Sequence, residues 1–342
     1  MQSIKPKLIC LTPIKNESWI LELFLKSASL WADHIIIADQ NSTDNSREIV
    51  KNFAKATLVD NKSDIFNETD RQKLLINEAR KIPGPKILIS LDADELISPN
   101  IFKSKEWESM LSLKPGTVLY FQLYNLRPDF QTYWAHNYYT PLGYVDDGSE
   151  HQGLDIHSPR IPISKESPMF FFKEVKAIHF QYVDWNRMQS KHRWYQCWER
   201  INHPERNPIS IFRQYHHMYA VRESEFQQIP QSWIDFFCRK NINIFDFVIE
   251  KKYYWDKVVL NYFDTYGTEC FSGEYIWDIN WVKLAEDYGH KNPQKYKDPR
   301  TDEEKRLHSW LWNTRSKPRH NLVIKYDNLL LKMCSDNNKQ EV

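Results

Sequence analysis

Short runs of branched aliphatic residues alternate with longer segments of helical spacing along the first hundred positions. Apolar runs at residues 7–11, 34–38 and 56–59 each precede polar turn or capping residues. The segment that starts at Ile20 then repeats its apolar residues every three or four positions, which predicts one buried stripe on a helix. A fourth apolar run begins at Lys86. Strands that alternate with helices in this way predict a parallel sheet with right-handed crossovers, and hence the α/β class.

The fourth run ends in a group of carboxylates, Asp92, Asp94 and Glu95. The carboxyl end of a strand is where an open α/β sheet binds its ligands. If the pleat of the strand continues through Ala93, Asp92 and Asp94 point to the same side. Two converging carboxylates repel each other and a divalent cation offsets that repulsion, so the pair predicts a metal site. Glu95 is expected to support the site or to lie on the surface, rather than to bind the metal.

An isolated Asp-x-Asp is also common in surface turns, so the remaining motifs have to separate the two interpretations. Neither Gly-x-Gly-x-x-Gly nor Gly-x-x-x-x-Gly-Lys occurs, and the chain has only eight glycines, which argues against a glycine-rich phosphate loop. A metal held by carboxylates is the alternative way to neutralise a diphosphate.

Three motifs, each at the end of a predicted strand, resemble those of glycosyltransferase family 2, whose members have the GT-A fold. They are Thr12-Pro13-Ile14-Lys15-Asn16-Glu17, Ala38-Asp39-Gln40-Asn41-Ser42-Thr43-Asp44 and Leu91-Asp92-Ala93-Asp94. The family usually has Asn-Glu after the first strand, Asp-Asp-Gly-Ser-Thr-Asp after the second and Asp-x-Asp after the fourth. The resemblance covers residues 7–100 well and continues weakly to about 185. It implies a GT-A catalytic domain over residues 1–185.

The resemblance implies that the first two motifs bind the nucleotide. Thr12 and Pro13, with Glu17 in the same motif, would border the base, and Asp39 would hydrogen-bond it, typically as uracil. Arg71 stands where many members have a basic residue against the base or the diphosphate. Its alternative is a solvated position on a helix.

The third motif would bind the ribose and the metal. The resemblance implies that Asp92 contacts the ribose or the metal and that Asp94 ligates Mg²⁺ or Mn²⁺ at the diphosphate. Some GT-A enzymes add a late histidine, and His179, at the end of an apolar strand, is the candidate here; a structural histidine is the alternative. Gln40 and Asn41 depart from the family pattern, where an aspartate and a glycine stand, and this departure leaves the identity of the base open.

Inverting glycosyl transfer needs one carboxylate on the acceptor side to take the proton of the attacking hydroxyl. A second carboxylate is unnecessary because the metal-bound diphosphate leaves without a proton. The polar stretch downstream of Asp-x-Asp offers Asp147, Glu150 and Asp155. We expect the catalytic base among these three, with Glu150 favoured. The alternative for each is a solvated acidic loop.

The second half of the chain is helical, polar and aromatic, and it contains nine of the 13 tryptophans. We expect a helical C-terminal subdomain over residues 186–334 and a disordered tail over residues 335–342. Most of the aromatic residues have helical spacing, which favours packing over stacking on acceptor sugar rings. The basic residues Lys317, Arg319 and Lys325 leave peripheral contact with an anionic membrane open.

Composition narrows the class of protein. The 46 basic and 45 acidic residues nearly cancel, which argues against a nucleic-acid partner. The five cysteines include no Cys-x-x-Cys pair, which favours a reduced compartment over a disulfide framework or structural zinc. The absence of an apolar signal core or a lipid-spanning run adds to the expectation of a cytoplasmic protein.

The sequence therefore predicts a metal-assisted, inverting transferase of the hexosyl or N-acetylhexosaminyl type. The donor would be a nucleotide sugar, expected to be a UDP-sugar, and the acceptor a hydroxyl of a glycan or lipid-linked saccharide, as in polysaccharide biosynthesis. One alternative is an inactive nucleotide- or glycan-binding protein of the same fold. Another is a nucleotidyltransferase, although residues 12–17 lack the lysine- and glycine-rich loop that it would need. The sequence leaves the oligomeric state open.

Overall fold

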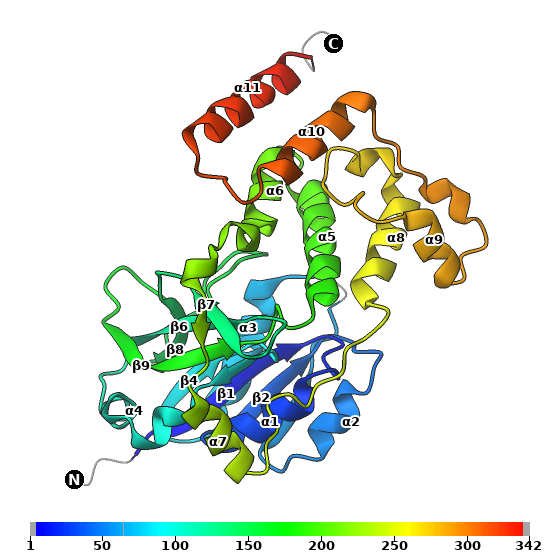
Figure 1. Cartoon of the computed structure of the whole chain (residues 1–342). Coiled ribbons are helices and arrows are strands. Elements are labelled where there is room, and N and C mark those ends of the chain that lie inside the picture. The colour runs from blue at the N-terminus through cyan, green and yellow to red at the C-terminus, as the bar shows by residue number, and fades with distance from the viewer. Residues whose placement is uncertain (1–4, 64, 338–342) are drawn as a thin grey trace. The chain divides into compact units, whose positions relative to one another are not determined.

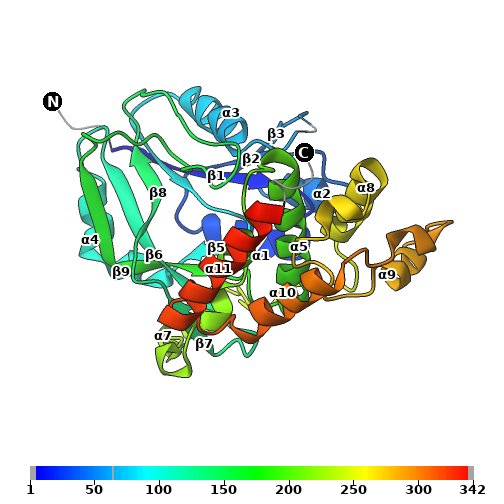
Figure 2. The same cartoon turned by 90° about the horizontal axis from the view of Figure 1, so that it is seen from above.

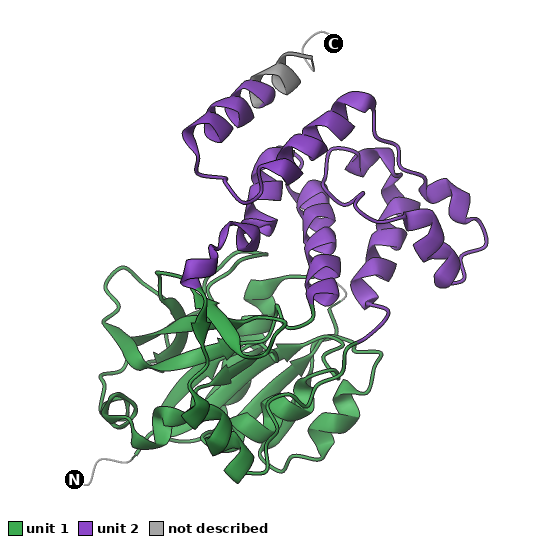
Figure 3. Cartoon of the chain, viewed as in Figure 1, with its two compact units in different colours: residues 1–184, 226–249 green, residues 185–225, 250–342 purple. Residues whose placement is uncertain are grey.

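The computed structural model describes residues 5–63 and 65–337 of the chain, with side chains up to residue 330. Its contacts divide the chain into a first unit, residues 1–184 and 226–249, and a second unit, residues 185–225 and 250–342 (Figure 3). The first unit therefore includes residues 226–249, a segment that the sequence analysis placed in the C-terminal subdomain.

The centre of the first unit is a set of four parallel strands in the order β3-β2-β1-β4. Their bounds are β1 Lys7–Ile14, β2 His34–Asp39, β3 Ala56–Asp60 and β4 Lys86–Ser90. Both faces of β1 are buried, so its sequence is an almost continuous apolar run. The predicted α/β class with a parallel central sheet is confirmed.

Antiparallel pairing extends the sheet beyond β4 through β8, β6, β7 and β10. A further strand, β9, lies parallel to β6 and antiparallel to β5. The bounds are β5 Glu95–Ile97, β6 Val118–Leu126, β7 Thr132–Ala135, β8 Thr140–Val145, β9 Met169–His179 and β10 Gln227–Gln228. This mixed half of the sheet brings the end of β9 beside the segment that follows β4.

Helices cover both faces of the parallel strands (Figures 1 and 2). Helix α3 (Glu68–Arg80) packs Leu75 and Ile76 against Ile9 and Leu11 of β1. The alternate β1 residues, such as Cys10, face a larger core that includes α1 (Leu21–Ala28) and α2 (Ser46–Lys51). The same core takes in α4 (Lys105–Met110) and α7 (Gln231–Arg239). The expected arrangement of a mostly parallel sheet between helices, as in the GT-A fold, is therefore present.

The second unit is helical. Its α-helices are α5 Trp185–Asn202, α6 Pro208–Tyr215, α8 Tyr254–Tyr266, α9 Trp281–Asp287, α10 Asp302–Asn313 and α11 Asn321–Asn337. Thr301 and Glu304 form a capping box at the start of α10. Helix α11 reaches Asn337, so residues 335–337 of the expected disordered tail are helical, and residues 338–342 lie outside the described part of the chain. Within the described residues, no helix has the length and apolar character needed to cross a bilayer.

A cluster of charged side chains lies inside this helical unit: Glu199, Arg200, Arg206 and Glu274, here called the helical cluster. Arg206 Nη1 lies 2.5 Å from Glu199 Oε1, and Arg200 Nη2 lies 2.6 Å from Glu274 Oε1. Neither carboxylate side chain is exposed to solvent. Burial raises the pKa of Glu274 to about 7, against the opposing effect of Arg200. The second unit therefore contains an ion-pair network whose two carboxylates are shielded from solvent.

Candidate functional site

The carboxyl ends of β1, β2 and β4 meet at one edge of the sheet. Ile14 of β1 pairs with Asp39 of β2, and the Leu91 amide donates to the Leu11 carbonyl across from β4. Thr12 and Pro13 lie buried within β1, which extends three residues beyond its predicted end. The three sequence motifs therefore come together at this edge.

The loops after β1 and β2 are joined by side-chain hydrogen bonds. Asn16 has φ +57°, and its Oδ1 accepts from the Thr43 amide at 2.7 Å. The Asn16 amide donates to Ser42 Oγ at 2.9 Å, and the Glu17 amide donates to Ser46 Oγ at 3.0 Å. The polar motif residues in these loops therefore hold the two loops to each other.

The two departures from the family pattern have local structural roles. Asn41 has φ +54°, a left-handed conformation that asparagine adopts more readily than most residues, so it can stand where the family has glycine. Gln40 is buried, and its Nε2 donates to the carbonyls of Ser63 and Ile65, both at 3.1 Å. Gln40 therefore holds the loop that follows β3.

Asp39 is engaged by protein groups. Its carboxylate side chain has no exposed surface, and it accepts from Arg47 Nη1 at 2.6 Å and from the Ser42 amide at 3.3 Å. Arg47 also donates to Asp60 and keeps 38% of its side chain exposed. The group that faces solvent at the end of β2 is therefore the arginine that Asp39 holds.

Glu17 also contacts a protein group, since its Oε2 accepts from the Trp19 indole at 2.7 Å.

The expectation that Asp92 and Asp94 point the same way is wrong. Strand β4 ends at Ser90, and the Glu95 amide donates to the Asp92 carbonyl at 3.0 Å, which closes a turn over Ala93. A turn breaks the two-residue alternation of side chains on which the expectation depended. Asp92 and Asp94 consequently contact different partners.

Asp92 belongs to a cluster with Glu95 and Arg160, here called the strand-end cluster. Arg160 Nη2 donates to Asp92 Oδ2 at 2.8 Å, and its Nη1 donates to Glu95 Oε2 at 2.5 Å. Glu95 is fully buried and also accepts from the Asp92 amide, whereas 31% of the Asp92 side chain is exposed. Burial alone would lower the pKa of the Arg160 guanidinium, but the two carboxylates outweigh it and raise that pKa. Sequence reasoning did not identify Arg160, because no motif marks a contact so distant along the chain.

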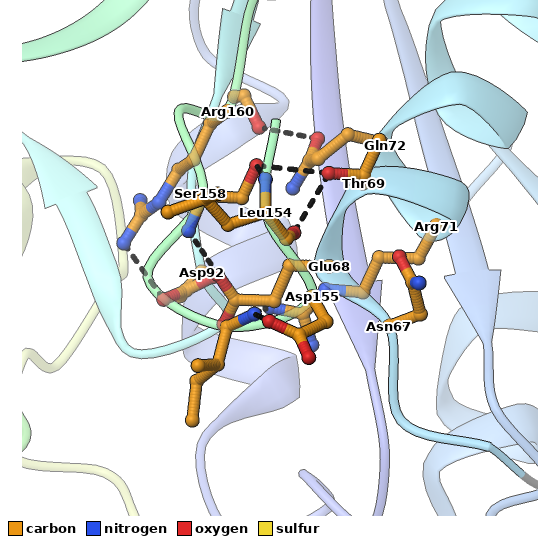
Figure 4. Close-up of polar contacts among 12 residues, drawn as sticks. Asn67, Glu68, Thr69, Arg71, Gln72, Asp92, Leu154, Asp155, Ser158 and Arg160 are labelled. Atoms are coloured by element: carbon orange, nitrogen blue, oxygen red, sulfur yellow. Dashed lines mark hydrogen bonds and ion pairs between the residues drawn. The ribbon is translucent and has the colours of Figure 1, made fainter. Parts of the chain in front are cut away.

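The segment that carries Arg160 lies against the start of α3 (Figure 4). Asn67 caps this helix by accepting from the Asp70 amide. Glu68 then receives the Ser158 amide on its Oε2 at 2.8 Å, and its own amide donates to the Asp155 carbonyl at 2.9 Å. Thr69 Oγ1 donates to the Leu154 carbonyl at 2.7 Å. These bonds place Asp155 on the loop that also supplies Arg160.

Arg71 lies one turn into α3, beside the same loop. Its guanidinium is over the Phe66 ring, 5.2 Å from the centroid, and its Nη2 lies 3.3 Å from Glu68 Oε1. The buried Nε of Arg71 has no hydrogen-bond partner among the described residues. A second arginine therefore lies near the strand-end cluster with donor capacity to spare.

Asp94 faces His179, which comes from the end of β9. Asp94 Oδ2 lies 3.8 Å from His179 Nε2, and both side chains are largely buried. The other ring nitrogen, Nδ1, lies 2.8 Å from Asn125 Oδ1, an acceptor that favours the proton on Nδ1 and the lone pair on Nε2. His179 lies beside Asp94 and Asn125 because of the strand register: β9 pairs His179 with both Glu95 of β5 and Asn125 of β6.

The three candidate bases fall in two places. Asp147 follows β8, whose last residues pair with the start of β4. Its carboxylate accepts from the Tyr144 hydroxyl and from the Ser149 amide. Burial raises the pKa of Asp147, but these hydrogen bonds outweigh it and lower that pKa. Glu150 is exposed and follows Ser149, whose carbonyl accepts from Arg80 at the last turn of α3. Asp147 and the Ser149 turn thus lie at the amino end of β4, and Asp155 lies near its carboxyl end.

The described residues contain no cluster of side chains large enough to hold a metal ion by themselves. No group of three or more His, Cys, Asp or Glu side chains there could hold a metal ion. Of the predicted ligands, the structure brings Asp94 and His179 together and places Asp92 with Arg160.

Residues 10–176 match the model of the family described as Glycosyl transferase family 2. This match supports glycosyltransferase family 2 for that segment. The matched segment contains Asp39, Asp92, Asp94 and Arg160, and it ends three residues before His179. No curated protein matches the chain.

Solved structures resemble parts of the chain at low similarity. Glucosyl-3-phosphoglycerate synthase from Mycobacterium tuberculosis is 17% identical over 36% of this chain and 44% of its own, with a TM-score of 0.25. A 4-diphosphocytidyl-2C-methyl-D-erythritol synthase is 15% identical over 42% and 76%, with a TM-score of 0.29. The inositol-1-phosphate CTP transferase from T. maritima is 10% identical over 52% and 91%, with a TM-score of 0.30. The chain spans less than half of the mycobacterial enzyme, and TM-scores this low support no functional conclusion.

Proposed function

We propose that this chain is a nucleotide-sugar glycosyltransferase that acts with a bound Mg²⁺ or Mn²⁺. The observation that carries the proposal is the approach of Asp94 to His179, with 3.8 Å between their Oδ2 and Nε2 atoms, at the ligand-binding edge of the sheet. The family match over residues 10–176 supports a glycosyltransferase and includes Asp94.

Asp94 and His179 fit a divalent cation as two of its ligands. The Asn125 contact leaves the Nε2 lone pair of His179 directed to the side of Asp94. Mg²⁺ in phosphate-transfer sites usually takes one or two protein ligands and completes its shell with substrate phosphates and water. A two-residue site therefore suits a cation that arrives with the nucleotide. When bound, the cation would neutralise the charge that develops on the departing diphosphate.

The other residues of the edge would position the donor. Thr12 and Pro13 would border the nucleoside, and Asp39 would act through Arg47, the exposed group that it orients. Arg160 and Arg71 would offer N–H donors to the diphosphate or the sugar, since a guanidinium matches phosphate oxygens in two-point hydrogen bonds. About a third of the Asp92 side chain is exposed, so its carboxylate could release Arg160 and accept a hydrogen bond from a ribose hydroxyl instead.

Asp155 is the candidate base that the geometry favours. It is on the loop held by Glu68, five residues before Arg160, whereas Asp147 lies at the opposite end of β4. In an inverting transfer, Asp155 would accept the proton of an acceptor hydroxyl as that oxygen attacks the anomeric carbon and the nucleoside diphosphate leaves. The acceptor would be a hydroxyl of a glycan or lipid-linked saccharide, and the donor a UDP-sugar.

Thermal unfolding with UDP, GDP, CDP and dTDP, each with Mn²⁺ and again with EDTA, tests the donor site. A nucleotide at 100 times its dissociation constant adds about 2.7 kcal/mol to the free energy of unfolding, enough for a clear shift. We expect one nucleotide to stabilise the protein in Mn²⁺ and to lose most of this effect in EDTA. Asp94→Asn should abolish the metal-dependent part, and the exposed control Asp302→Asn should keep it. No shift with any nucleotide would refute the proposal.

A further inference from the structure

Helix α11, the last helix of the chain, packs on the second unit with one of its faces. Val323 and Asp327 on this face are buried, and Leu330 packs on a small core with Leu311 of α10. The Asp327 carboxylate accepts from Arg213 Nε and Nη2, both at 3.0 Å. These contacts fix which side of α11 is turned to the protein and which side is turned to solvent.

The solvent side of α11 carries a stripe of large apolar side chains. Leu322, Tyr326 and Leu329, here called the α11 stripe, are separated by four and three positions, which places them along one side of a helix. Their exposed fractions are 68%, 42% and 51%. Lys325 is exposed beside them, three residues after Leu322 and four before Leu329. Scattered exposed apolar residues are ordinary, but a contiguous patch of them indicates an interaction site.

The segment around the α11 stripe is positively charged. Residues 315–330 include four basic residues and one acidic residue, Asp327. Lys317, Arg319 and Lys325 are exposed, whereas Asp327 is buried in its ion pair with an arginine of α6. The charge that this segment presents to solvent is therefore positive, and its one carboxylate is turned into the protein.

This combination favours a surface of anionic lipids over a second copy of the chain. An amphipathic helix with basic residues beside its apolar side chains lies in the boundary between headgroups and acyl chains, and anionic headgroups attract its charges. A tyrosine such as Tyr326 suits this boundary, because its ring is apolar and its hydroxyl is polar. A second copy would bring the same positive charges together, and a stable protein interface takes about 20–30 residues from each partner.

We propose that α11 binds the surface of a membrane that contains anionic lipids, with the α11 stripe at the boundary of headgroups and acyl chains. Lys317, Arg319 and Lys325 contact the lipid phosphates. This contact needs neither the nucleotide nor the metal of the first unit. If the chain transfers a sugar to a lipid-linked acceptor, the contact would hold the enzyme at the surface where that acceptor lies, and this role alone rests on the proposed function.

Flotation of the full chain with lipid vesicles tests the proposal. One set of vesicles contains phosphatidylcholine alone, and the other contains about 30% phosphatidylglycerol as the anionic lipid. We expect at least about tenfold tighter binding to the anionic vesicles, and this preference should shrink as the salt concentration rises, because salt screens exposed charges. Asp94→Asn should bind vesicles as the wild type does, so failure of the donor site and failure of this surface give different results.

The apolar contribution is tested by Leu322→Ser combined with Leu329→Ser. Both side chains are exposed, so the fold should remain, which the unfolding midpoint verifies. Binding to the anionic vesicles should weaken at least about tenfold, since the two leucines no longer bury apolar surface. Val248→Ser with Ile249→Ser is the matched control, because these residues are 62% and 60% exposed and lie outside α11.

The electrostatic contribution is tested by changing Lys317, Arg319 and Lys325 together to Gln. Binding to the anionic vesicles should weaken about a hundredfold, and binding to phosphatidylcholine alone should stay the same. The matched control changes three exposed lysines of the first unit to Gln, namely Lys62, Lys73 and Lys103.

Three results would overturn the proposal. The first is that the wild type does not float with either set of vesicles. The second is that the α11 variants and their controls lose affinity equally. The third is that sedimentation shows a dimer that the double leucine variant converts to a monomer, without vesicle binding, since the α11 stripe would then be an interface between two copies of the chain.

Discussion

Each unit of this chain has a cluster in which arginine is paired with two carboxylates, and the two clusters differ in one respect that bears on function. In the helical cluster each glutamate has its own arginine, and neither carboxylate is exposed. In the strand-end cluster a single arginine serves both Asp92 and Glu95, and Asp92 keeps 31% of its side chain exposed. Fully buried carboxylates can support the fold, whereas a shared arginine and an exposed carboxylate can exchange partners with a ligand.

This difference follows from the elements that carry the clusters. The helical cluster is built from helix faces and the chain segments packed on them, which shield its two glutamates from water. The strand-end cluster follows the end of β4, where the backbone leaves the sheet and side chains meet solvent. Changes at the first cluster should therefore lower stability, and changes around the second should lower activity.

The largest effect is expected at Asp155, next to the strand-end cluster. Asp155→Asn removes the proposed base and should lower transfer about a thousandfold, within the range of general-base catalysis, with little change in stability. Glu150→Gln is the matched control and should change the rate less than twofold. Product formation from a UDP-sugar and a saccharide acceptor measures both. Should the control lose activity and Asp155→Asn keep it, the base would lie on the Ser149 turn.

The next largest effect is a loss of stability in the helical cluster. Arg200→Leu leaves Glu274 buried without its cation and should lower the free energy of unfolding by about 3 kcal/mol. The exposed Arg222, paired with Glu225, is the control, and Arg222→Leu should change stability by less than about 0.5 kcal/mol. Urea unfolding measures both. Similar midpoints for the two variants would show that the cluster does not stabilise the unit.

The helical cluster should also make stability depend on pH. The pKa of Glu274 is about 7 in the folded chain and about 4.5 as an ordinary glutamate, so between these values the folded chain keeps a proton that the unfolded chain releases. The free energy of unfolding should therefore fall as pH rises from 5 to 7, by at most about 1.4 kcal/mol per pH unit. Glu274→Gln should remove this slope. Parallel pH curves for the variant and the wild type would contradict the assignment.

The smallest effect is expected from Arg160→Lys. The lysine keeps the positive charge but cannot reach Asp92 and Glu95 together, so nucleotide binding should weaken about tenfold while the fold remains. Isothermal titration calorimetry in Mn²⁺, with the nucleotide that the thermal scan selects, measures this change in affinity. Arg80→Lys is the control, because Arg80 holds Asp146 at the opposite end of β4. An equal loss in the control would remove Arg160 from the donor site.

The sequence alone determined the parallel sheet and the edge where its motifs meet. Local spacing is enough for this, because strand and helix periods and capping residues act over a few positions, as the capping box of Thr301 and Glu304 illustrates. The motif order placed Asp39 at the end of β2 and Asp92 and Asp94 after β4, the two strands on either side of β1. The site residues whose positions depend only on strand order could therefore be predicted from the sequence.

Tertiary structure decided which of these side chains face each other. The turn over Ala93 separates Asp92 from Asp94, and the pairing of β9 with both β5 and β6 brings His179 to Asp94 and Asn125. Arg160 meets Asp92 because the loop that carries it is hydrogen-bonded to Glu68 and Thr69 of α3. Contacts of this kind join residues far apart along the chain, and their register depends on packing that no local pattern encodes.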